Sequence, residues 1–384
     1  MNFEFATSGR IIFGAGTVAQ AGPAAAQMGA RALVAVGAPD EVTAVLLDIL
    51  AQHNVAVTRF IVSDEPTIQT IAAGVSLARQ AGCQVVIGLG GGSAIDTGKA
   101  IAALLTNGGE PLDYLEVIGR GRPLTQPSAP MIAIPTTAGT GAEVTRNAVL
   151  ASPKHRLKAS LRSPHMLPTL AIVDPELTYA LPPDVTISTG LDALTQVLEP
   201  FVSNKANPVT DALCRDGLAR GARSLRPVVR NGRDTAARED MALTSLFGGL
   251  ALANAKLGAV HGFAGVLGGM YHAPHGIICA RLLPHVMAAN VRALLARAPE
   301  HPALARYDEV AQILTGRPTA TAANGVAWIE ALCADLAVPP LCDFGLEEDA
   351  FAAVVAQSQQ ASSMKGNPIP LTNAELTEIL EMGI

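Results

Sequence analysis

The sequence predicts an α/β amino-terminal domain built on a parallel sheet, followed by an all-helical carboxy-terminal domain. In the first half, short apolar runs alternate with stretches of helical length, which is typical of parallel strands joined by crossover helices. After Asp174 such runs become few and helical patterns dominate. The change falls near Leu181-Pro182-Pro183, so we expect domains at residues 1–181 and 182–384.

Each element follows from local pattern. Apolar runs rich in β-branched residues predict buried strands, and longer patterns with helical periodicity predict helices. The expected strands are Ala32–Val36, Val55–Val62, Val85–Leu89, Met131–Ile134 and Leu170–Val173. The expected helices are Val42–His53, Thr67–Gln80, Leu191–Glu199, Val209–Ser224, Arg238–Leu257, Pro302–Leu314 and Ala322–Leu336.

Composition narrows the function classes. Of 384 residues, 49% are hydrophobic and 16% charged, which is too apolar for a disordered chain. The net charge of -6 argues against a general nucleic-acid binder. Five widely spaced cysteines without a CxxC pair argue against a disulfide framework or a cysteine-based zinc site. With no signal-peptide pattern and no uninterrupted apolar stretch of about 18 residues, we expect a cytoplasmic protein that contacts neither nucleic acid nor membrane. We also expect a homodimer that acts on small molecules.

A glycine-rich loop follows the third expected strand. Gly91, Gly92 and Ser93 lead directly into an apparent helix that contains Asp96. Backbone N–H groups in such a loop, together with the helix amino terminus, suit a pyrophosphate. The alternative is a plain tight turn between strand and helix. The spacing is neither the usual GxGxxG fingerprint nor a Walker A loop.

A second polar cluster follows the next strand, where Thr136, Thr137 and Thr140 alternate with glycines. Hydroxyl groups at the carboxyl end of a strand suit contacts to a nucleotide, although a threonine-rich helix cap would give the same pattern. Two such loops, each after an apolar strand, indicate a nucleotide site more strongly than either loop does alone.

Histidines are concentrated in one Gly-rich apolar segment, which contains His261, His272 and His275. Neutral imidazoles there could bind a divalent metal, although each could instead be an ordinary hydrogen-bonded histidine. Upstream, Asp192 and Gln196 are spaced i, i+4 on an expected helix, so their oxygens share one face. Taken alone, that pair would be an ordinary feature of an amphipathic helix.

These motifs, taken in order, resemble the iron-containing (group III) alcohol dehydrogenases, which have the dehydroquinate synthase-like fold. The resemblance spans nearly the whole chain. The matching segments are Arg10–Thr17, the Gly90–Lys99 loop similar to GGGSxxDxxK, Pro135–Glu143 similar to PTTAGTGSE, Val173–Thr178 similar to VDPELT, and the pair His261 and His275 ending in Pro274-His275-Gly276.

The resemblance implies a Rossmann-like dinucleotide-binding domain, a helical domain, and a divalent metal in a cleft between them. It implies that Asp192, Gln196, His261 and His275 hold Fe2+ or Zn2+. Gln196 departs from the family pattern, which has histidine there, and Gly265 stands where many members have a further histidine. A neutral amide should weaken binding of iron or zinc and favour oxygen-preferring ions.

The resemblance also implies NAD or NADP as cofactor. Its binding set would comprise residues of both polar loops and the strand ends: Gly37, Gly91, Gly92, Ser93, Asp96, Thr136, Thr137, Thr140, Lys158 and Leu177. In many members an acidic residue ends the second strand and contacts the ribose, but Gly37 stands there in this chain. NADP is therefore possible, although Asp40 lies three residues later and could serve.

The leading hypothesis is an NAD(P)-dependent alcohol or aldehyde oxidoreductase in which a divalent metal assists hydride transfer. We expect His261 and His272 at the catalytic centre, with His272 as a candidate proton relay. One alternative is a metal-independent keto-acid reductase similar to maleylacetate reductase, which the Gln196 departure favours. Another is a nucleotide-binding relative whose catalytic centre has degenerated.

Overall fold

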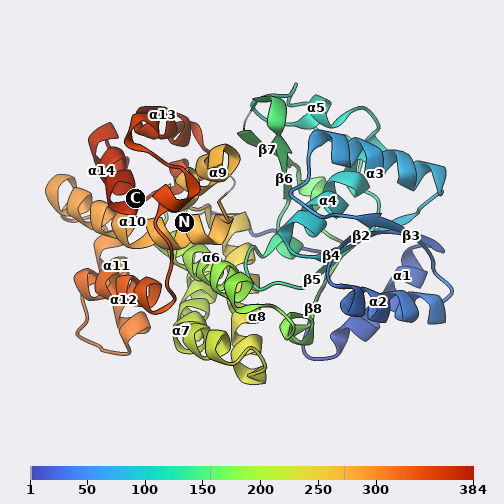
Figure 1. The fold of residues 1–384 in the computed structure, drawn as a ribbon, viewed down its shortest axis with the longest axis horizontal. Helices are drawn as coiled ribbons and strands as arrows, with labels where there is room; N and C mark the ends of the chain where they lie inside the picture. Colours follow the sequence, from blue (N-terminus) through green and yellow to red (C-terminus); the bar gives the residue numbers. More distant parts are fainter. Residues whose placement is uncertain (1, 156, 272) are drawn as a thin grey trace. The chain divides into compact units, whose positions relative to one another are not determined.

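A computed structural model describes residues 2–155, 157–271 and 273–384. The chain forms two compact units, shown in Figure 1. The α/β unit comprises Ala6–Thr137 and Gly141–Ala180. The helical unit comprises Leu181–Ile384, together with Ala138–Thr140 and the amino-terminal segment that ends at Phe5. A parallel-sheet unit followed by an all-helical unit confirms the predicted fold class.

The α/β unit is built on a six-stranded sheet in the order β1-β8-β5-β4-β2-β3, and its described pairings are all parallel. The strands are β1 (Ile11–Phe13), β2 (Arg31–Gly37), β3 (Ala56–Ile61), β4 (Val85–Gly90), β5 (Met131–Pro135) and β8 (Leu170–Val173). From β2 the chain runs outward to β3 and then crosses to β4 on the other side. The topological switch point, where open α/β sheets bind ligands, therefore lies between β2 and β4.

Helices cover both faces of this sheet (Figure 1). One face packs against α1 (Ala21–Met28) and α2 (Asp40–Gln52), and the other against α3 (Ile68–Gln80) and α4 (Gly92–Asn107). Residues of β2 alternate between the two cores, as the pleat of a strand requires. Burial on both faces explains why the central strands are continuous apolar runs. A short helix, α5 (Pro111–Tyr114), follows α4.

An antiparallel hairpin of β6 (Asn147–Ser152) and β7 (Leu157–Arg162) follows the second polar loop. Its burial alternates along β6, which indicates one packed face and one more open face. The sequence analysis did not anticipate these two strands.

The helical unit contains a set of packed helices: α6 (Pro183–Val202), α7 (Pro208–Arg230), α8 (Thr235–Ala255), α9 (Ala259–Tyr271), α10 (His275–Arg297), α11 (Ala303–Thr315), α12 (Ala322–Asp335), α13 (Phe351–Gln360) and α14 (Asn373–Gly383). The predicted helices correspond to α6, α7, α8, α11 and α12. Helices α9 and α10, which contain His261 and His275, and the two carboxy-terminal helices were not predicted.

One helix, α10, is long and apolar enough to span a membrane by length and composition. Two thirds of its apolar window is buried inside the protein (67%), and its side chains belong to the core of the helical unit. Its apolar character is therefore that of a core helix, and it is no span.

Candidate dinucleotide loops and metal centre

The glycine loop joins β4 to α4 at the carboxyl edge of the sheet. Gly91 is the N-cap of α4 and has no side chain that could accept hydrogen bonds from the first turn. The Ala94 N–H donates to the Gly91 carbonyl (3.1 Å), so the N–H groups of Gly92 and Ser93 are those that we expect to meet an anion, which the partial positive charge of the helix end also attracts. Ser93 lies in this turn and is partly exposed.

Gly37 lies beside this loop. It ends β2 in register with Gly90, which ends β4, so both sit at the topological switch point. Gly90 has a φ of +147°, and a Cβ there would approach the carbonyl carbon of Gly37 to 2.9 Å. The two strand ends meet through bare backbone, and Gly37 itself is exposed. The position predicted from the sequence to face the cofactor ribose thus adjoins the predicted phosphate loop.

The second polar loop begins at the end of β5. The Thr136 N–H donates to the Gly90 carbonyl (3.0 Å), which ties this loop to the glycine loop. A Cβ at Gly91 would lie 3.4 Å from the Thr137 hydroxyl, so these residues are neighbours. Thr140 is partly exposed and groups with the helical unit.

Three further residues of the predicted cofactor set have protein partners or packing of their own. Asp96 pairs with Lys99 through Oδ1 (2.8 Å) and accepts the Val149 N–H through Oδ2 (2.9 Å). Lys158, on β7, pairs with Glu65 at 2.5 Å. Leu177 is partly buried against one core of the sheet. Their contact with a cofactor stays a prediction.

The predicted metal ligands come from three helices of the helical unit. Asp192 and Gln196 lie one turn apart on α6 and are both buried. His261 is the third residue of α9, and His275 is the first residue of α10. Both imidazoles therefore lie at the amino-terminal ends of their helices. Their ring centroids are 5.4 Å apart.

The ligand atoms of this group converge. His261 Nε2 lies 3.2 Å from Asp192 Oδ1, and His275 Nε2 lies 3.9 Å from the same oxygen. A fourth candidate is Cys279, one turn into α10, whose Sγ lies 3.8 Å from His261 Nε2. One donor atom from each of the four residues lies within 4.8 Å of the others.

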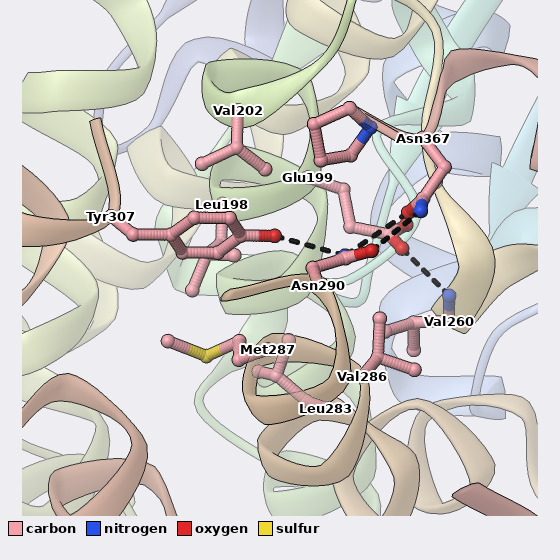
Figure 2. A pocket seen from close by; sticks show the side chains of 12 residues that line it. Leu198, Glu199, Val202, Val260, Leu283, Val286, Met287, Asn290, Tyr307 and Asn367 are labelled. Carbon is pink, nitrogen blue, oxygen red and sulfur yellow. Dashed lines mark hydrogen bonds between the residues drawn. The ribbon is translucent and has the colours of Figure 1, made fainter. Parts of the chain in front are cut away.

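A buried glutamate orients His261. Glu199, one turn beyond Gln196 on α6, accepts the His261 Nδ1–H through Oε2 (2.7 Å) and the Val260 N–H through Oε1 (2.7 Å, Figure 2). An ionised carboxylate can only accept, so Nδ1 carries a proton, and Nε2 is the nitrogen that faces Asp192 and Cys279. Carboxylates commonly orient metal-binding histidines in this way.

The charges fit a cation at this point. Burial favours the protonated form of Asp192, but the hydrogen bond from His261 and the charge of His275 outweigh it and lower the Asp192 pKa. Burial opposes protonation of His261, yet Cys279, Asp192 and Glu199 raise its pKa well above its ordinary value. These side chains therefore stabilise a positive charge among Asp192, His261 and Cys279. A divalent metal ion would supply that charge.

Gln196 behaves differently from the three other predicted ligands. Its amide Nε2 donates to the Gly139 carbonyl (2.9 Å), within the helical unit. Its role as a metal ligand stays a prediction. His272, the predicted proton relay, lies outside the described residues. Gly265 lies on α9, and a Cβ there would meet no atom within 4 Å, so its missing side chain leaves open space.

Sequence reasoning missed Cys279 and Glu199. The cysteine pattern was tested only for CxxC pairs. His275 and Cys279 are instead spaced i, i+4 at the start of a helix. Glu199 follows Asp192 by seven residues, two turns along the same face of α6. Helical spacing from the predicted ligands was the signal that could have found both.

Known proteins match the whole arrangement. The family models "Iron-containing alcohol dehydrogenase" and "Fe-containing alcohol dehydrogenase family, C-terminal" match residues 8–175 and 186–383. Alcohol dehydrogenase 4 of Schizosaccharomyces pombe is 35% identical, with 96% of this chain and 86% of the relative covered. The crystal structure of a 1,3-propanediol oxidoreductase is 32% identical, with a TM-score of 0.90 and complete coverage of both chains.

A sulfoacetaldehyde reductase from Bifidobacterium kashiwanohense, solved in complex with NAD+, is 29% identical. Its TM-score is 0.86, and 100% of this chain and 99% of that chain are covered. The predicted family and enzyme class are confirmed by these matches together with the Asp192, His261 and His275 group. The chain belongs to the iron-containing alcohol dehydrogenase family of oxidoreductases.

Proposed function

We propose that this enzyme transfers hydride between NAD(P) and a small alcohol or aldehyde, with Asp192, His261 and His275 holding a divalent metal. The single observation that carries this proposal is the convergence of their donor atoms on one buried point. A bound ion supplies Lewis acidity, which favours loss of the hydroxyl proton from an alcohol and polarises the carbonyl of an aldehyde.

The protein groups supply orientation and charge. Asp192 contributes a buried negative charge, and Glu199 holds the His261 ring through Nδ1. His275 has a side chain that is 36% exposed, so it forms the open side of the group, from which a substrate oxygen can approach. His272 remains our candidate for relaying the substrate proton.

For the cofactor, we infer that the pyrophosphate binds at Gly91, Gly92 and Ser93, with Thr136, Thr137 and Thr140 lining the nucleotide. The open glycine loop at the switch point supports this assignment. Gly37 offers no carboxylate to repel a 2′-phosphate, so we expect NADPH to be accepted as well as NADH.

Gly37→Asp should lower the affinity for NADPH more than the affinity for NADH. Equal loss of affinity for both cofactors would contradict the placement of Gly37 at the ribose.

The deciding experiment is an assay of small alcohols and aldehydes with NAD(H) and NADP(H), run on metal-stripped enzyme with and without Fe2+, Zn2+ or Mn2+. We expect turnover to return when metal is added back. In Asp192→Asn, both turnover and bound metal should be lost. Turnover of a keto acid by the stripped enzyme would instead favour the metal-independent reductase. No turnover with any cofactor would favour a degenerate nucleotide-binding relative.

We also infer a cytoplasmic homodimer. Its small-molecule chemistry requires no membrane or nucleic-acid partner. Sedimentation of the purified protein tests the dimer, and fractionation of the source cells tests the location.

A further inference from the structure

We propose that the Cys279 thiolate is the fourth protein ligand of the metal, so that the site is an Asp-His-His-Cys set. This inference deepens the proposed metal-dependent function and rests on it. Cys279 takes the place of the imidazole that is missing at Gln196, from a different helix. The site then has four protein ligands, whereas the sequence alone indicates a site weakened by the replacement of a histidine with Gln196.

The distances match a single ion. Metal–nitrogen and metal–oxygen bonds of about 2.0–2.2 Å and metal–sulfur bonds of about 2.3 Å place the ligand atoms of a tetrahedral ion about 3.3–3.6 Å apart. The Asp192–His261, His275–Asp192 and Cys279–His261 separations are 3.2, 3.9 and 3.8 Å. No two of the four donor atoms lie more than 4.8 Å apart. Side-chain movements of up to about an ångström would therefore bring all four atoms within bonding distance of one ion.

Local structure directs the sulfur toward the same point as the imidazoles. His275 and Cys279 stand at i and i+4 of α10, so their side chains share one face of the helix. Cys279 is fully buried, and its sulfur faces the His261 nitrogen. The buried Cys333 contrasts with it, because its thiol donates to the Ala280 carbonyl at 3.4 Å and has no imidazole partner among its described contacts.

The Gln196 amide nitrogen and side-chain stem are engaged elsewhere, which leaves only the amide oxygen as a possible donor to the metal. The amide nitrogen donates to Gly139, and a Cβ at Gly248 would lie 3.0 Å from the Gln196 Cβ, so α8 packs closely on the stem. This packing and hydrogen bond give Gln196 a structural role on α6. The fourth ligand then comes from the sulfur, which already faces the donor set.

The ligand change alters metal preference and charge. Asp192 and a Cys279 thiolate together carry two negative charges, which match a divalent ion. Forming the sulfur–metal bond releases the thiol proton to solvent, so binding should release protons and weaken at low pH. A thiolate with two imidazoles favours Zn2+ and Fe2+ over Mn2+ and Mg2+, the reverse of what an amide oxygen in its place would favour.

X-ray absorption at the zinc edge of the wild-type protein, loaded with one equivalent of Zn2+, tests the ligand set directly. We expect one sulfur scatterer at about 2.3 Å and nitrogen or oxygen scatterers at about 2.0–2.2 Å. A shell of only nitrogen and oxygen would overturn the proposal, because it would assign the fourth position to Gln196 or water. This measurement needs no variant and does not depend on activity.

Cobalt substitution separates Cys279 from the other buried thiols. We expect Co2+ to give a sulfur-to-cobalt charge-transfer band in the wild type and in the control Cys214→Ser, whose buried thiol lies outside the donor set. Cys279→Ser should lose the band and bind Co2+ at least tenfold more weakly. The two serine variants are compared after circular dichroism shows that both are folded.

The outcomes distinguish this proposal from the function on which it rests. If Co2+ binds without a sulfur band and Asp192→Asn abolishes binding, the metal site stands and Cys279 is not its ligand. A band that persists in Cys279→Ser has the same meaning. If neither Zn2+ nor Co2+ binds the wild type, the metal-dependent function and the ligand assignment both fail.

Discussion

A buried lysine of α4, Lys99, holds the segment after the second polar loop against this helix. The Lys99 ammonium pairs with Asp96 on the same helix (2.8 Å). It also donates to the Thr145 hydroxyl (2.9 Å) and to the Asn147 carbonyl, which lie outside α4. Nearby, Glu143 is almost completely buried. Lysine is seldom fully buried without such partners, so these contacts account for its presence in the core.

Glu143 should make stability depend on pH. Burial, only partly offset by the Lys99 charge, raises the Glu143 pKa from 4.5 to about 7. The folded protein then holds a proton that the unfolded chain has lost, so the stability that Glu143 contributes is greatest below about pH 4.5 and falls as pH rises toward 7. The loss is on the order of 3 kcal/mol.

Glu143→Gln removes this contribution, because the amide does not titrate. Urea unfolding at about pH 5 and about pH 8 should show a smaller difference between the two pH values in the variant than in the wild type. The exposed Glu347→Gln serves as control and should behave as the wild type. An unchanged pH difference in Glu143→Gln would contradict the assignment.

At the residue scale, the sequence singles out candidate ligands whose residue type is distinctive, but not those whose position matters only beside a neighbour. Asp192, His261 and His275 stand out in the sequence, and their atoms converge. Cys279 does not stand out, because a lone cysteine is usually a small core residue. Its position becomes informative only when α10 is known to begin at His275.

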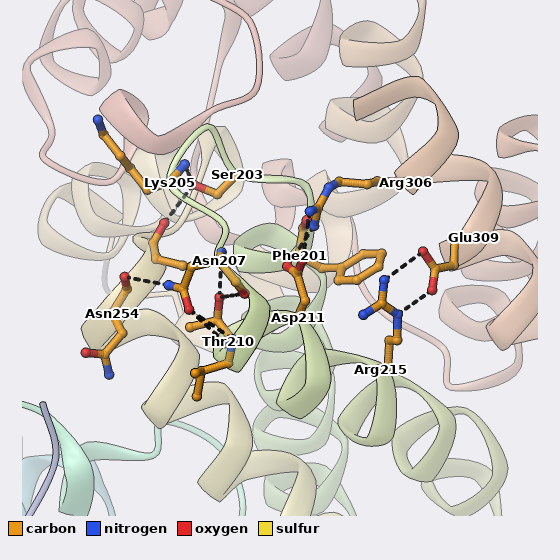
Figure 3. Close-up of polar contacts among 12 residues, drawn as sticks. Phe201, Ser203, Lys205, Asn207, Thr210, Asp211, Arg215, Asn254, Arg306 and Glu309 are labelled. Atoms are coloured by element: carbon orange, nitrogen blue, oxygen red, sulfur yellow. Dashed lines mark hydrogen bonds and ion pairs between the residues drawn. The ribbon is translucent and has the colours of Figure 1, made fainter. Parts of the chain in front are cut away.

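Among the elements, the end of α6 is held by two arginines that flank one aromatic ring (Figure 3). Arg306, from α11, makes two 2.7 Å contacts with the carboxylate of Asp211 and donates to the Phe201 carbonyl at 2.7 Å. Arg215, from α7, pairs with Glu309 more openly, with side chains 46% and 34% exposed. Both guanidinium groups lie over the Phe201 ring.

Arg306→Lys should destabilise the helical unit by about 1–3 kcal/mol, because lysine cannot make the two-point contact with Asp211 and reach Phe201 as well. Arg215→Lys is the matched control, in which the same chemical change on an exposed pair should cost less than about 1 kcal/mol. Urea unfolding of both variants measures the difference. Equal losses would show that burial of the Arg306 pair adds nothing.

Gly90 and Gly92, on either side of the β4–α4 junction, have different requirements. Gly92→Val should lower dinucleotide affinity more than tenfold, about 1.4 kcal/mol, while the protein stays folded, because the branched side chain obstructs the N–H groups of the first turn. Gly90→Ala should instead destabilise the fold, because a Cβ there lies 2.8 Å from that of Ala94 at a φ of +147°. Calorimetry with NADH and thermal unfolding separate the two effects. Unchanged affinity in Gly92→Val would contradict the loop assignment.

Elements were predictable where burial dominated the local pattern. The five predicted strands match β2, β3, β4, β5 and β8. Except for β3, which lies at the sheet edge, these are central parallel strands, which form continuous apolar runs. The β6–β7 hairpin was missed because Pro153 and the charged residues after it interrupt a weakly apolar segment. Helices α9 and α10 were missed because glycines crowd α9 and Pro284 lies inside α10, and tertiary packing overrides both penalties.

For the whole molecule, the candidate metal group lies entirely in the helical unit, and the candidate cofactor set, apart from Thr140, lies in the α/β unit. The glycine loop at Gly90–Ser93 and the strand ends belong to the α/β unit, whereas Asp192, His261, His275 and Cys279 belong to the helical unit. The sequence shows this division through its change in pattern near residue 181. It gives no sign that Ala138–Thr140 groups with the helical unit, because that contact is made by packing of distant segments.

Because the two sites lie in different units, the two ligands should stabilise different helices and strands. Zn2+ at 100 times its dissociation constant adds about 2.7 kcal/mol to any opening that breaks the site. Amides of α6 and α10 that exchange through such openings should therefore exchange about a hundredfold more slowly. Those of β2 and β4 should respond to NADH instead. Hydrogen exchange with mass spectrometry, peptide by peptide, measures both, with Asp192→Asn as the control that should lose the zinc response and keep the NADH response. Zinc protection that persists in Asp192→Asn, or that appears only in the α/β unit, would place the metal elsewhere in the molecule.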